Sequence, residues 1–238
     1  MDNIKFTIVV VTYNCEKTLE ETIISIVNQT YTNKELVIID GKSNDGTLDI
    51  IKKYESHISC FISEPDNGIY DAMNKALKNA TGDYLIFLGS DDHFMSYGIL
   101  KRVSEYINDN NSIYYANVFR PIHKDVYCHK FNKYKLAVKN ISHQAIFYSK
   151  NVYKKYSYNV HYKTHADYVN NLNIYKSFPF VYIPEVVCYY NEGGVSSKNK
   201  DVNFIKDRGK IVCNTVGVLP YLYSCIYHFL RNLIKIKQ

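Results

Sequence analysis

Residues 62–92 read ISEPDNGIYDAMNKALKNATGDYLIFLGSDD, and their pattern of apolar and polar residues indicates three successive elements. The first residues of this stretch end an apolar run, and Asp66-Asn67-Gly68 then has the composition of a turn. Apolar side chains between Ile69 and Ala80 recur at helical spacing, which predicts a helix. Asp83–Leu88 follows as a mostly apolar strand that stops at the acidic pair Asp91-Asp92. The stretch therefore predicts a strand–helix–strand unit that brings two carboxylates to the end of a buried strand.

The residues before this stretch repeat the alternation of strand and helix. Phe6–Val11 (FTIVVV) is a continuous, β-branched apolar run, as expected of a strand buried on both faces. A helix is predicted over residues 16–29, a second strand over Glu35–Asp40, a helix with Ile51 in its apolar stripe, and a short third strand over Ile58–Ser63. Such alternation predicts an α/β fold with a mostly parallel central sheet and helices on both of its faces.

The second half of the chain is less regular. Extended segments and one helix are predicted at five places there: strands over Ser112–Phe119, Val126–Phe131 and Ile141–Tyr148, a helix over Ala166–Ser177, and an extended segment over Phe180–Tyr190. Pro184 inside the last segment implies a bend or a sheet edge, because proline cannot donate to a sheet ladder. We expect these strands to form a smaller, mixed sheet.

Composition limits the class of protein. The chain has 238 residues, 46% of them apolar and 22% charged, which suits one large α/β domain or one domain with a small appendage and argues against disorder. Its six cysteines show no metal-finger or redox spacing, so we expect free thiols in a reducing compartment. The N-terminus has no basic segment followed by an apolar one, so we expect no export signal and a cytoplasmic protein.

The C-terminal tail carries the net charge. Residues 198–238 hold eight Lys/Arg against two Asp/Glu, whereas residues 1–197 are balanced. Nucleic acid or an anionic membrane surface would attract such a tail. Val216–Leu230 is mostly apolar but shorter than the roughly 20 residues of a membrane-spanning helix. A helix lying in a membrane interface and a helix packed on the domain both fit this segment.

Polar residues gather where the predicted parallel strands end. In such sheets ligands bind beyond the carboxyl ends of the strands. The residues at those ends are Thr12-Tyr13-Asn14, Asp40, Glu64–Gly68 and Asp91-Asp92. Acids that converge at one rim repel each other unless a cation or hydrogen-bond donors intervene. Mg²⁺ or Mn²⁺ favours carboxylate and phosphate oxygens, so Asp91-Asp92 is a candidate hard-metal site, with one acid at the metal and the other at a ribose.

Two common nucleotide-binding motifs are missing. The first strand is followed neither by a Gly-x-x-x-x-Gly-Lys-Ser/Thr loop nor by Gly-x-Gly-x-x-Gly. Their absence argues against a P-loop enzyme and against a dinucleotide-dependent dehydrogenase. If a diphosphate binds at this rim, a metal ion and scattered donors must balance its charge.

The motifs in this order and spacing resemble family 2 glycosyltransferases of the GT-A fold. The resemblance is dense over residues 5–95, through TIVVVTYN (7–14), ELVIIDGKSNDGT (35–47) and residues 62–92. It continues through ISHQAIFYSK (141–150), THADY (164–168) and NEGGVSS (191–197). It implies a catalytic domain over residues 1–197, with a nucleotide-binding half (1–95) and an acceptor half (96–197), followed by a basic, aromatic helical tail over 198–238.

The resemblance implies roles for the rim residues. Thr12, Tyr13 and Asn14 would line the nucleotide-sugar pocket, and Asp40 would accept a hydrogen bond from uracil. Asp91-Asp92 stands at the place of the family's Asp-x-Asp motif, although the first position of the triplet here is Ser90. Asp92 would then hold the Mn²⁺ or Mg²⁺ that bridges the donor diphosphate, with Asp91 nearer the ribose.

Asp167 aligns with the family's catalytic base. A sugar hydroxyl is a poor nucleophile, and a carboxylate within hydrogen-bond reach can take its proton during attack. Attack opposite the leaving diphosphate inverts the anomeric carbon, while the metal stabilises charge on the phosphate. Apart from the resemblance, an acid in the first turn of a helix is also favoured simply by the helix dipole.

Several other residues have two interpretations each. His143 and Gln144 would line the donor or acceptor pocket, or be hydrogen-bonded core residues. Lys42 would meet a phosphate or be a solvated loop charge. Gly193–Ser196 would close over the site as a flexible loop or be a simple turn. The polar face of the helix that begins at Ile69 would support the nucleotide site or face solvent.

The leading hypothesis is an inverting glycosyltransferase of bacterial surface polysaccharide (O-antigen or capsule) synthesis. The resemblance implies a UDP-hexose or UDP-N-acetylhexosamine donor and a lipid-linked (undecaprenyl diphosphate) saccharide acceptor at the inner face of the cytoplasmic membrane. A sugar-phosphate nucleotidyltransferase is a second hypothesis, but it would need a Gly-rich, Arg-containing loop where Thr12–Cys15 stands. A non-enzymatic protein that binds nucleic acid through its tail is a third. It leaves the rim acids unexplained, so we expect no nucleic-acid partner.

Overall fold

The computed structural model describes residues 4–192 and 200–236. Its strands are β1 (Phe6–Thr12), β2 (Lys34–Asp40), β3 (Cys60–Ser63), β4 (Tyr84–Gly89), β5 (His93–Phe94), β6 (Ile113–Arg120), β7 (Asp125–Tyr127), β8 (Ile146–Ser149) and β9 (Phe180–Tyr189). Its helices are α1 (Leu19–Val27), α2 (Thr47–Lys53), α3 (Ile69–Asn79), α4 (Ile99–Tyr106), α5 (Lys133–Val138), α6 (Lys150–Tyr153), α7 (Ala166–Tyr175), α9 (Val202–Thr215) and α10 (Val218–Ile236), with short 3₁₀ helices η1 (Glu55–His57) and η2 (His143–Ala145).

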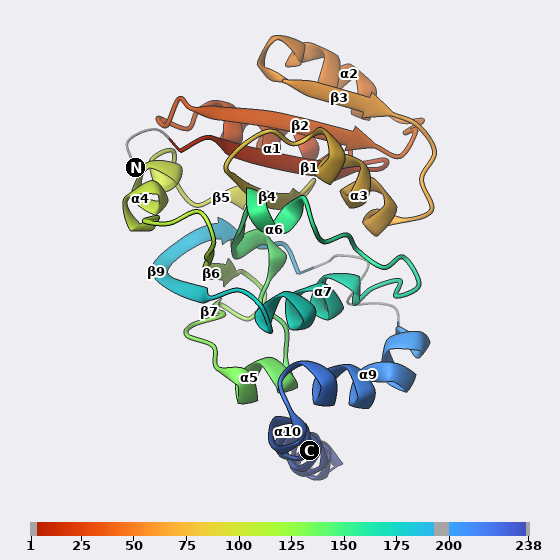
Figure 1. The fold of residues 1–238 in the computed structure, drawn as a ribbon. Helices are drawn as coiled ribbons and strands as arrows, with labels where there is room; N and C mark the ends of the chain where they lie inside the picture. The colour runs from red at the N-terminus through yellow and green to blue at the C-terminus, as the bar shows by residue number, and fades with distance from the viewer. Residues whose placement is uncertain (1–3, 193–199, 237–238) are drawn as a thin grey trace.

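The strands form one sheet with a parallel half and a mixed half (Figure 1). Strands β3, β2, β1 and β4 run parallel in that order. Strand β8 joins β4 antiparallel, with Tyr84 opposite Ser149, and links it to β6. Strand β9 pairs with β6 in parallel, and β5 pairs with β9 antiparallel. The predicted α/β fold is therefore confirmed, and the strands predicted to form a smaller, mixed sheet are instead continuous with the parallel strands in one sheet.

Alternating side chains of the central strands divide the core into two layers. Val9, Val37 and Phe87 belong to one buried cluster, which also contains residues of α3, α7 and α9. Val10 and Leu88, their neighbours in sequence, belong to the other cluster, with residues of α1, α2 and α4. Because successive side chains of a strand point to opposite faces, each strand contributes to both layers and reads as a continuous apolar run.

Two strand predictions in the second half were wrong in extent. The predicted strand Val126–Phe131 ends at Tyr127, because Cys128 (φ 98°) and His129 (φ 51°) adopt left-handed backbone conformations that interrupt a strand. The predicted strand Ile141–Tyr148 forms only from Ile146 and is preceded by η2.

In β9, the register against β6 shifts between Tyr182 and Val186, so the ladder is irregular around Pro184, where a bend was expected.

The tail forms two helices packed beside α5 (Figure 1). The rings of Tyr134 and Tyr223 meet edge to face with centroids 5.6 Å apart, joining α5 to α10. A stripe of α10 on the other side is solvent-exposed; it consists of Leu219, Leu222, Ile226, Phe229 and Leu233. In the part of the chain that the structure describes, no helix is both long and apolar enough to cross a bilayer.

Candidate active site

A cleft of about 1030 Å³ opens at the carboxyl ends of the central strands. Its walls come from segments far apart in the sequence, namely the loops after β1 and β4, helix α3, η2, the start of α7 and the end of β9. The lining residues that bear on function are Asn14, Tyr70, Asp91, Asp92, Arg120, Tyr127, Asn140, His143, Gln144, Lys163, His165, Asp167 and Tyr190. The predicted acids Asp91, Asp92 and Asp167 thus share one cleft.

Asp92 is almost fully buried and has hydrogen bonds to both carboxylate oxygens. The backbone N–H of Asn191 donates to Oδ1 at 2.8 Å. The backbone N–H of Gly89 (3.1 Å) and the amide of Gln144 (2.9 Å) donate to Oδ2. Burial, followed by the neighbouring charge of Asp91, raises the pKa of Asp92 to about 6. Asp92 therefore joins the ends of β4 and β9 to η2.

Asp91 is in a different environment from its neighbour. Burial raises the pKa of its carboxyl group. Its oxygens face the cleft, and among residues 4–192 and 200–236 no other residue's side chain or backbone donates a hydrogen bond to them. The two adjacent acids thus differ as adjacent residues after a strand should, with one anchored by the protein and one available to a ligand.

Gly89 leaves the space that these carboxylates occupy. A Cβ atom at this position would lie 2.6 Å from Asp92 Oδ2 and 3.0 Å from Asp91 Oδ1. A carbon that close to an oxygen is inside van der Waals contact. Glycine at the end of β4 is therefore a steric requirement of the acidic pair.

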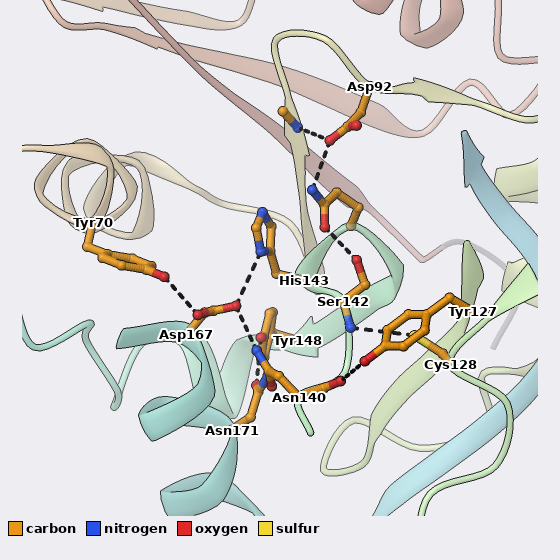
Figure 2. Close-up of polar contacts among 12 residues, drawn as sticks. Tyr70, Asp92, Tyr127, Cys128, Asn140, Ser142, His143, Tyr148, Asp167 and Asn171 are labelled. Atoms are coloured by element: carbon orange, nitrogen blue, oxygen red, sulfur yellow. Dashed lines mark hydrogen bonds and ion pairs between the residues drawn. The ribbon is translucent and has the colours of Figure 1, made fainter. Parts of the chain in front are cut away.

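Asp167 lies in the first turn of α7, and three side chains make polar contacts with its carboxylate. The Tyr70 hydroxyl donates to Oδ1 at 2.7 Å, and the Asn140 amide donates to Oδ2 at 2.8 Å. His143 Nδ1 lies 3.4 Å from Oδ2 (Figure 2). Burial alone would raise the pKa of Asp167, but the contacts with His143 and Tyr70 outweigh it and lower that pKa. The carboxylate is therefore ionised at neutral pH and ready to accept a proton.

A chain of buried amides holds Asn140 in place. The Tyr148 hydroxyl donates to Asn171 Oδ1 at 2.7 Å, and the Asn171 amide donates to Asn140 Oδ1 at 2.9 Å. With its oxygen so occupied, Asn140 must turn its N–H toward Asp167, as Figure 2 shows. Asn140, Asn171 and Tyr148 were not among the predicted site residues, because a single asparagine or tyrosine carries no pattern that marks a site.

The loops after β1 and β2 are braced against each other beside the cleft. Asn14, in a left-handed conformation (φ 52°), accepts a hydrogen bond from the Asn44 N–H at 3.0 Å, and its own N–H donates to Ser43 Oγ at 2.8 Å. Tyr13 is 60% exposed, and Lys42 (φ 65°) is also exposed. The hydroxyl of Thr12 is buried and has no hydrogen-bond partner among the described residues.

Asp40 is enclosed by serines rather than open to the cleft. Its side chain is fully buried. Ser43 donates from its backbone N–H (3.0 Å) and its hydroxyl (2.5 Å), and the Ser63 hydroxyl donates at 2.6 Å. A base that bound Asp40 would have to replace one of these bonds, so the predicted contact with uracil stays a prediction. The predicted loop Gly193–Ser196 lies outside the described residues.

Comparison with known proteins agrees with this architecture. The model of glycosyl transferase family 2 matches residues 7–177. A PGL/p-HBAD biosynthesis glycosyltransferase of Mycobacterium tuberculosis is 34% identical over 211 residues, which cover 84% of this chain and 82% of the relative. A UDP-Glc:alpha-D-GlcNAc-diphosphoundecaprenol beta-1,3-glucosyltransferase of Escherichia coli is 37% identical over 119 residues, about half of each chain (50% and 47%).

Two solved structures share the fold. TarS of S. aureus in complex with UDP-GlcNAc superposes with a TM-score of 0.74 at 20% identity, covering 89% of this chain and 67% of that one. The mannosyltransferase PcManGT of Pyrobaculum calidifontis, in complex with GDP-Man and Mn²⁺, gives a TM-score of 0.68 at 19% identity, covering 94% and 69%. The molecule is therefore an α/β enzyme of the GT-A fold. The chain belongs to glycosyl transferase family 2 and is a glycosyltransferase, which removes the nucleotidyltransferase and non-enzymatic hypotheses.

Proposed function

We propose that this enzyme is an inverting, metal-dependent glycosyltransferase of bacterial surface polysaccharide (O-antigen or capsule) synthesis. It would move a hexose or N-acetylhexosamine from a UDP-sugar to a lipid-linked saccharide. The observation that carries the proposal is the placement of Asp91, Asp92 and Asp167 in one cleft large enough for a sugar nucleotide and an acceptor.

Asp167 acts as the base in this proposal. The acceptor oxygen forms a bond to the anomeric carbon as the bond from that carbon to the diphosphate oxygen breaks, and the hydroxyl proton passes to Asp167. The lowered pKa of Asp167 supports this role, since the carboxylate is ionised before the acceptor arrives. The donors Tyr70 and Asn140 fix the orientation of its carboxylate group.

The acidic pair is suited to a divalent ion. Asp91 offers carboxylate oxygens to the cleft, and Asp92 retains lone-pair capacity beyond its three hydrogen bonds. Across residues 4–192 and 200–236, no group of three or more His, Cys, Asp or Glu side chains could hold a metal alone. Mg²⁺ commonly uses one or two carboxylates together with substrate phosphates, so the donor diphosphate would complete the set. When bound, the ion would offset the charge that develops on the leaving diphosphate.

The braced loops after β1 and β2 are the proposed nucleotide site. The unpartnered hydroxyl of Thr12 and the exposed ring of Tyr13 would contact the nucleoside, and Asn14 would face the cleft. Lys42 is exposed in the loop after β2 and would meet a phosphate. The UDP assignment is supported by the E. coli relative and by the TarS complex with UDP-GlcNAc. PcManGT was solved with GDP-Man, so the donor test must include both bases.

The tail supports a membrane-bound acceptor. The apolar stripe of α10 would lie on the inner face of the cytoplasmic membrane, where the net positive charge of the tail favours anionic headgroups. The E. coli relative is named for an acceptor on diphosphoundecaprenol. By analogy, the acceptor of this enzyme would be a saccharide on undecaprenyl diphosphate, and the enzyme a peripheral membrane protein.

A donor screen tests the catalytic part of the proposal. The purified chain with Mn²⁺ or Mg²⁺ is offered UDP- and GDP-sugars, and release of the nucleoside diphosphate is measured. We expect one UDP-sugar to be used, with activity lost by about 10²–10⁴-fold in Asp167→Asn and comparably in Asp92→Ala. Glu105→Gln, an exposed acid on α4, is the matched control and should be unaffected. If no nucleotide-sugar is hydrolysed or transferred with either metal, the proposal fails.

Vesicle flotation tests the membrane part separately. Wild type should bind vesicles that contain phosphatidylglycerol, and Leu222→Ser with Phe229→Ser should not, because both side chains belong to the exposed stripe. Ile122→Ser removes an apolar side chain that is 70% exposed elsewhere and serves as the control. Equal flotation of all three proteins would rule out the stripe as the membrane-binding surface.

A further inference from the structure

Two cations lie against Tyr127, at the edge of the cleft. Arg120 Cζ is 4.7 Å and Lys139 Nζ is 4.8 Å from the centroid of the Tyr127 ring. Arg120 and Tyr127 line the cleft itself. Arg120 is neutralised by a two-pronged ion pair with Asp125, at 2.8 and 2.6 Å. Lys139 is exposed and has no ion-pair partner among the described residues.

This edge of the cleft is connected directly to the proposed base. The Tyr127 hydroxyl donates to the carbonyl of Asn140 at 2.8 Å, and the Asn140 side chain contacts Asp167 (Figure 2). Lys139 is the residue before Asn140. A group bound at Lys139 would therefore sit next to the side of the cleft where an acceptor hydroxyl must meet Asp167.

Helix α10 adds positive charge on its inner side. Ser224, His228 and Arg231 recur at helical spacing on the side away from the apolar stripe, and Ser224 is fully buried. His228 Nε2 lies 3.2 Å from Arg208, whose guanidinium donates to the carbonyl of Ala137 in α5. Burial and the charges of Arg208 and Arg231 lower the pKa of His228, so the positive charges here belong to the arginines.

Arg231 and Lys139 stand on packed neighbouring segments. Helix α10 packs against α5, and His228 has a hydrogen bond with the backbone of Val138, so Arg231, one turn after His228, lies near Lys139, the residue after Val138. Burial lowers the pKa of Lys139, as do the positive charges of Arg120 and Arg231, while Cys128 and Asp125 oppose this shift. Arg231 is exposed and, like Lys139, forms no ion pair with a described residue. Unpaired cations held near one another repel, and an anion placed between them removes that repulsion.

We propose that Lys139 and Arg231 form a binding site for the diphosphate of a lipid-linked acceptor. The inference rests on the proposed function and identifies where the acceptor's charge is recognised. The site lies between the cleft and the apolar stripe of α10, so an acceptor bound there has its sugar toward Asp167 and its lipid toward the membrane. The two cations, which form no ion pair with a described residue, match the charge of two phosphates. A neutral glycoside carries no phosphate and so gains no affinity from these cations.

The test compares two acceptors that carry the same sugar, one on a prenyl diphosphate and one on a neutral octyl group. Lys139→Gln and Arg231→Gln are each expected to reduce the preference for the diphosphate acceptor, measured as the ratio of kcat/KM values, by about tenfold. The KM for the donor should not change. Lys155→Gln, which removes a lysine exposed elsewhere on the surface, is the matched control. An unchanged preference in both variants would overturn the site, as would an equal loss with both acceptors.

Direct binding separates this site from the proposed function and from general membrane affinity. Farnesyl diphosphate is titrated into wild type and Lys139→Gln without any donor, so the result does not depend on turnover. Weaker binding to the variant by about tenfold supports the site even if the transferase reaction proposed above is wrong. If the variant instead binds farnesyl diphosphate normally but loses affinity for phosphatidylglycerol vesicles, these cations serve phospholipid headgroups and the inference fails.

Discussion

The amide of Gln144 donates to Asp92 Oδ2 at 2.9 Å, and the residue before it, His143, contacts Asp167. One 3₁₀ turn thus touches both acidic centres of the cleft. The Ser142 hydroxyl donates to Gln144 Oε1 at 2.6 Å, which fixes the amide so that its N–H faces Asp92. The spacing between the proposed metal site and the proposed base is therefore set by two consecutive residues.

Replacing Gln144 should weaken metal binding. In Gln144→Leu, Asp92 Oδ2 loses one of its two donors, so the carboxylate is held less firmly and is costlier to keep ionised. We expect the metal concentration for half-maximal activity to rise by about tenfold, as is typical of lost outer-shell partners. Titration of Mn²⁺ against activity measures this. Ser142→Ala, which leaves the amide present, should show a smaller rise, and an unchanged titration for Gln144→Leu would mean that Asp92 does not hold the ion.

Removal of the Tyr70 hydroxyl should shift the pH dependence of the reaction. Tyr70→Phe deletes a donor to Asp167 Oδ1, and that hydrogen bond favours the ionised carboxylate. The pKa of the base should therefore rise, and the acidic limb of the pH profile of kcat/KM should move to higher pH. We expect roughly a tenfold loss of kcat at low pH and less at high pH. A uniform loss at every pH would instead mean that the hydroxyl contacts substrate.

The sequence predicted the acids better than it predicted what holds them. Asp91 and Asp92 follow a buried strand, and a strand end has a fixed place in a parallel sheet. The run ISHQAIFY also looks like a strand, but its first polar residues turn into η2 to satisfy Asp92 and Asp167. That choice depends on partners 52 residues (Asp92) and 24 residues (Asp167) away along the sequence, and no local pattern records it.

Left-handed residues and buried amides account for most of the other differences between the predicted and the observed structure. Cys128 and His129 end the predicted strand with backbone conformations that non-glycine residues seldom adopt, so composition could not signal the break. Asn171 is fully buried at a helical position where a polar residue would be expected to face solvent. Its burial is satisfied by Tyr148 and Asn140, whose side chains form hydrogen bonds with it from either side.

A methyl group at Gly89 should reduce activity by roughly 100-fold without unfolding the protein. The Cβ of Gly89→Ala would overlap Asp92 Oδ2 at 2.6 Å, and both acids would have to move to relieve the contact. Displacement of about 1 Å at a catalytic site can cost roughly 100-fold in rate. The check is kcat/KM beside a thermal unfolding curve. Gly98→Ala, where the nearest atom is the flexible end of Arg102 at 3.4 Å, is the control. Normal activity in Gly89→Ala would show that the pair is not held in its working geometry.

Glu35 should stabilise the fold in a pH-dependent way, at the end of the sheet opposite the cleft. Its carboxylate accepts hydrogen bonds from Thr7 (2.5 Å) and from the backbone and hydroxyl of Thr81, and Lys5 pairs with it at 2.6 Å. Burial opposes ionisation, but these partners lower the pKa of Glu35 from 4.5 to about 2.

Because the folded-state pKa of Glu35 is depressed, the stabilisation is fully present above the unfolded value of about 4.5 and is lost as pH falls toward 2. Glu35→Gln should therefore lower the free energy of unfolding by roughly 1–2 kcal/mol at pH 7, with the difference from wild type shrinking below pH 4. Urea denaturation at pH 7 and at pH 3 measures this difference in the free energy of unfolding, with Glu105→Gln as the exposed control. A difference that is the same at pH 7 and pH 3 would mean that the carboxylate's charge contributes nothing and that only shape matters at this position.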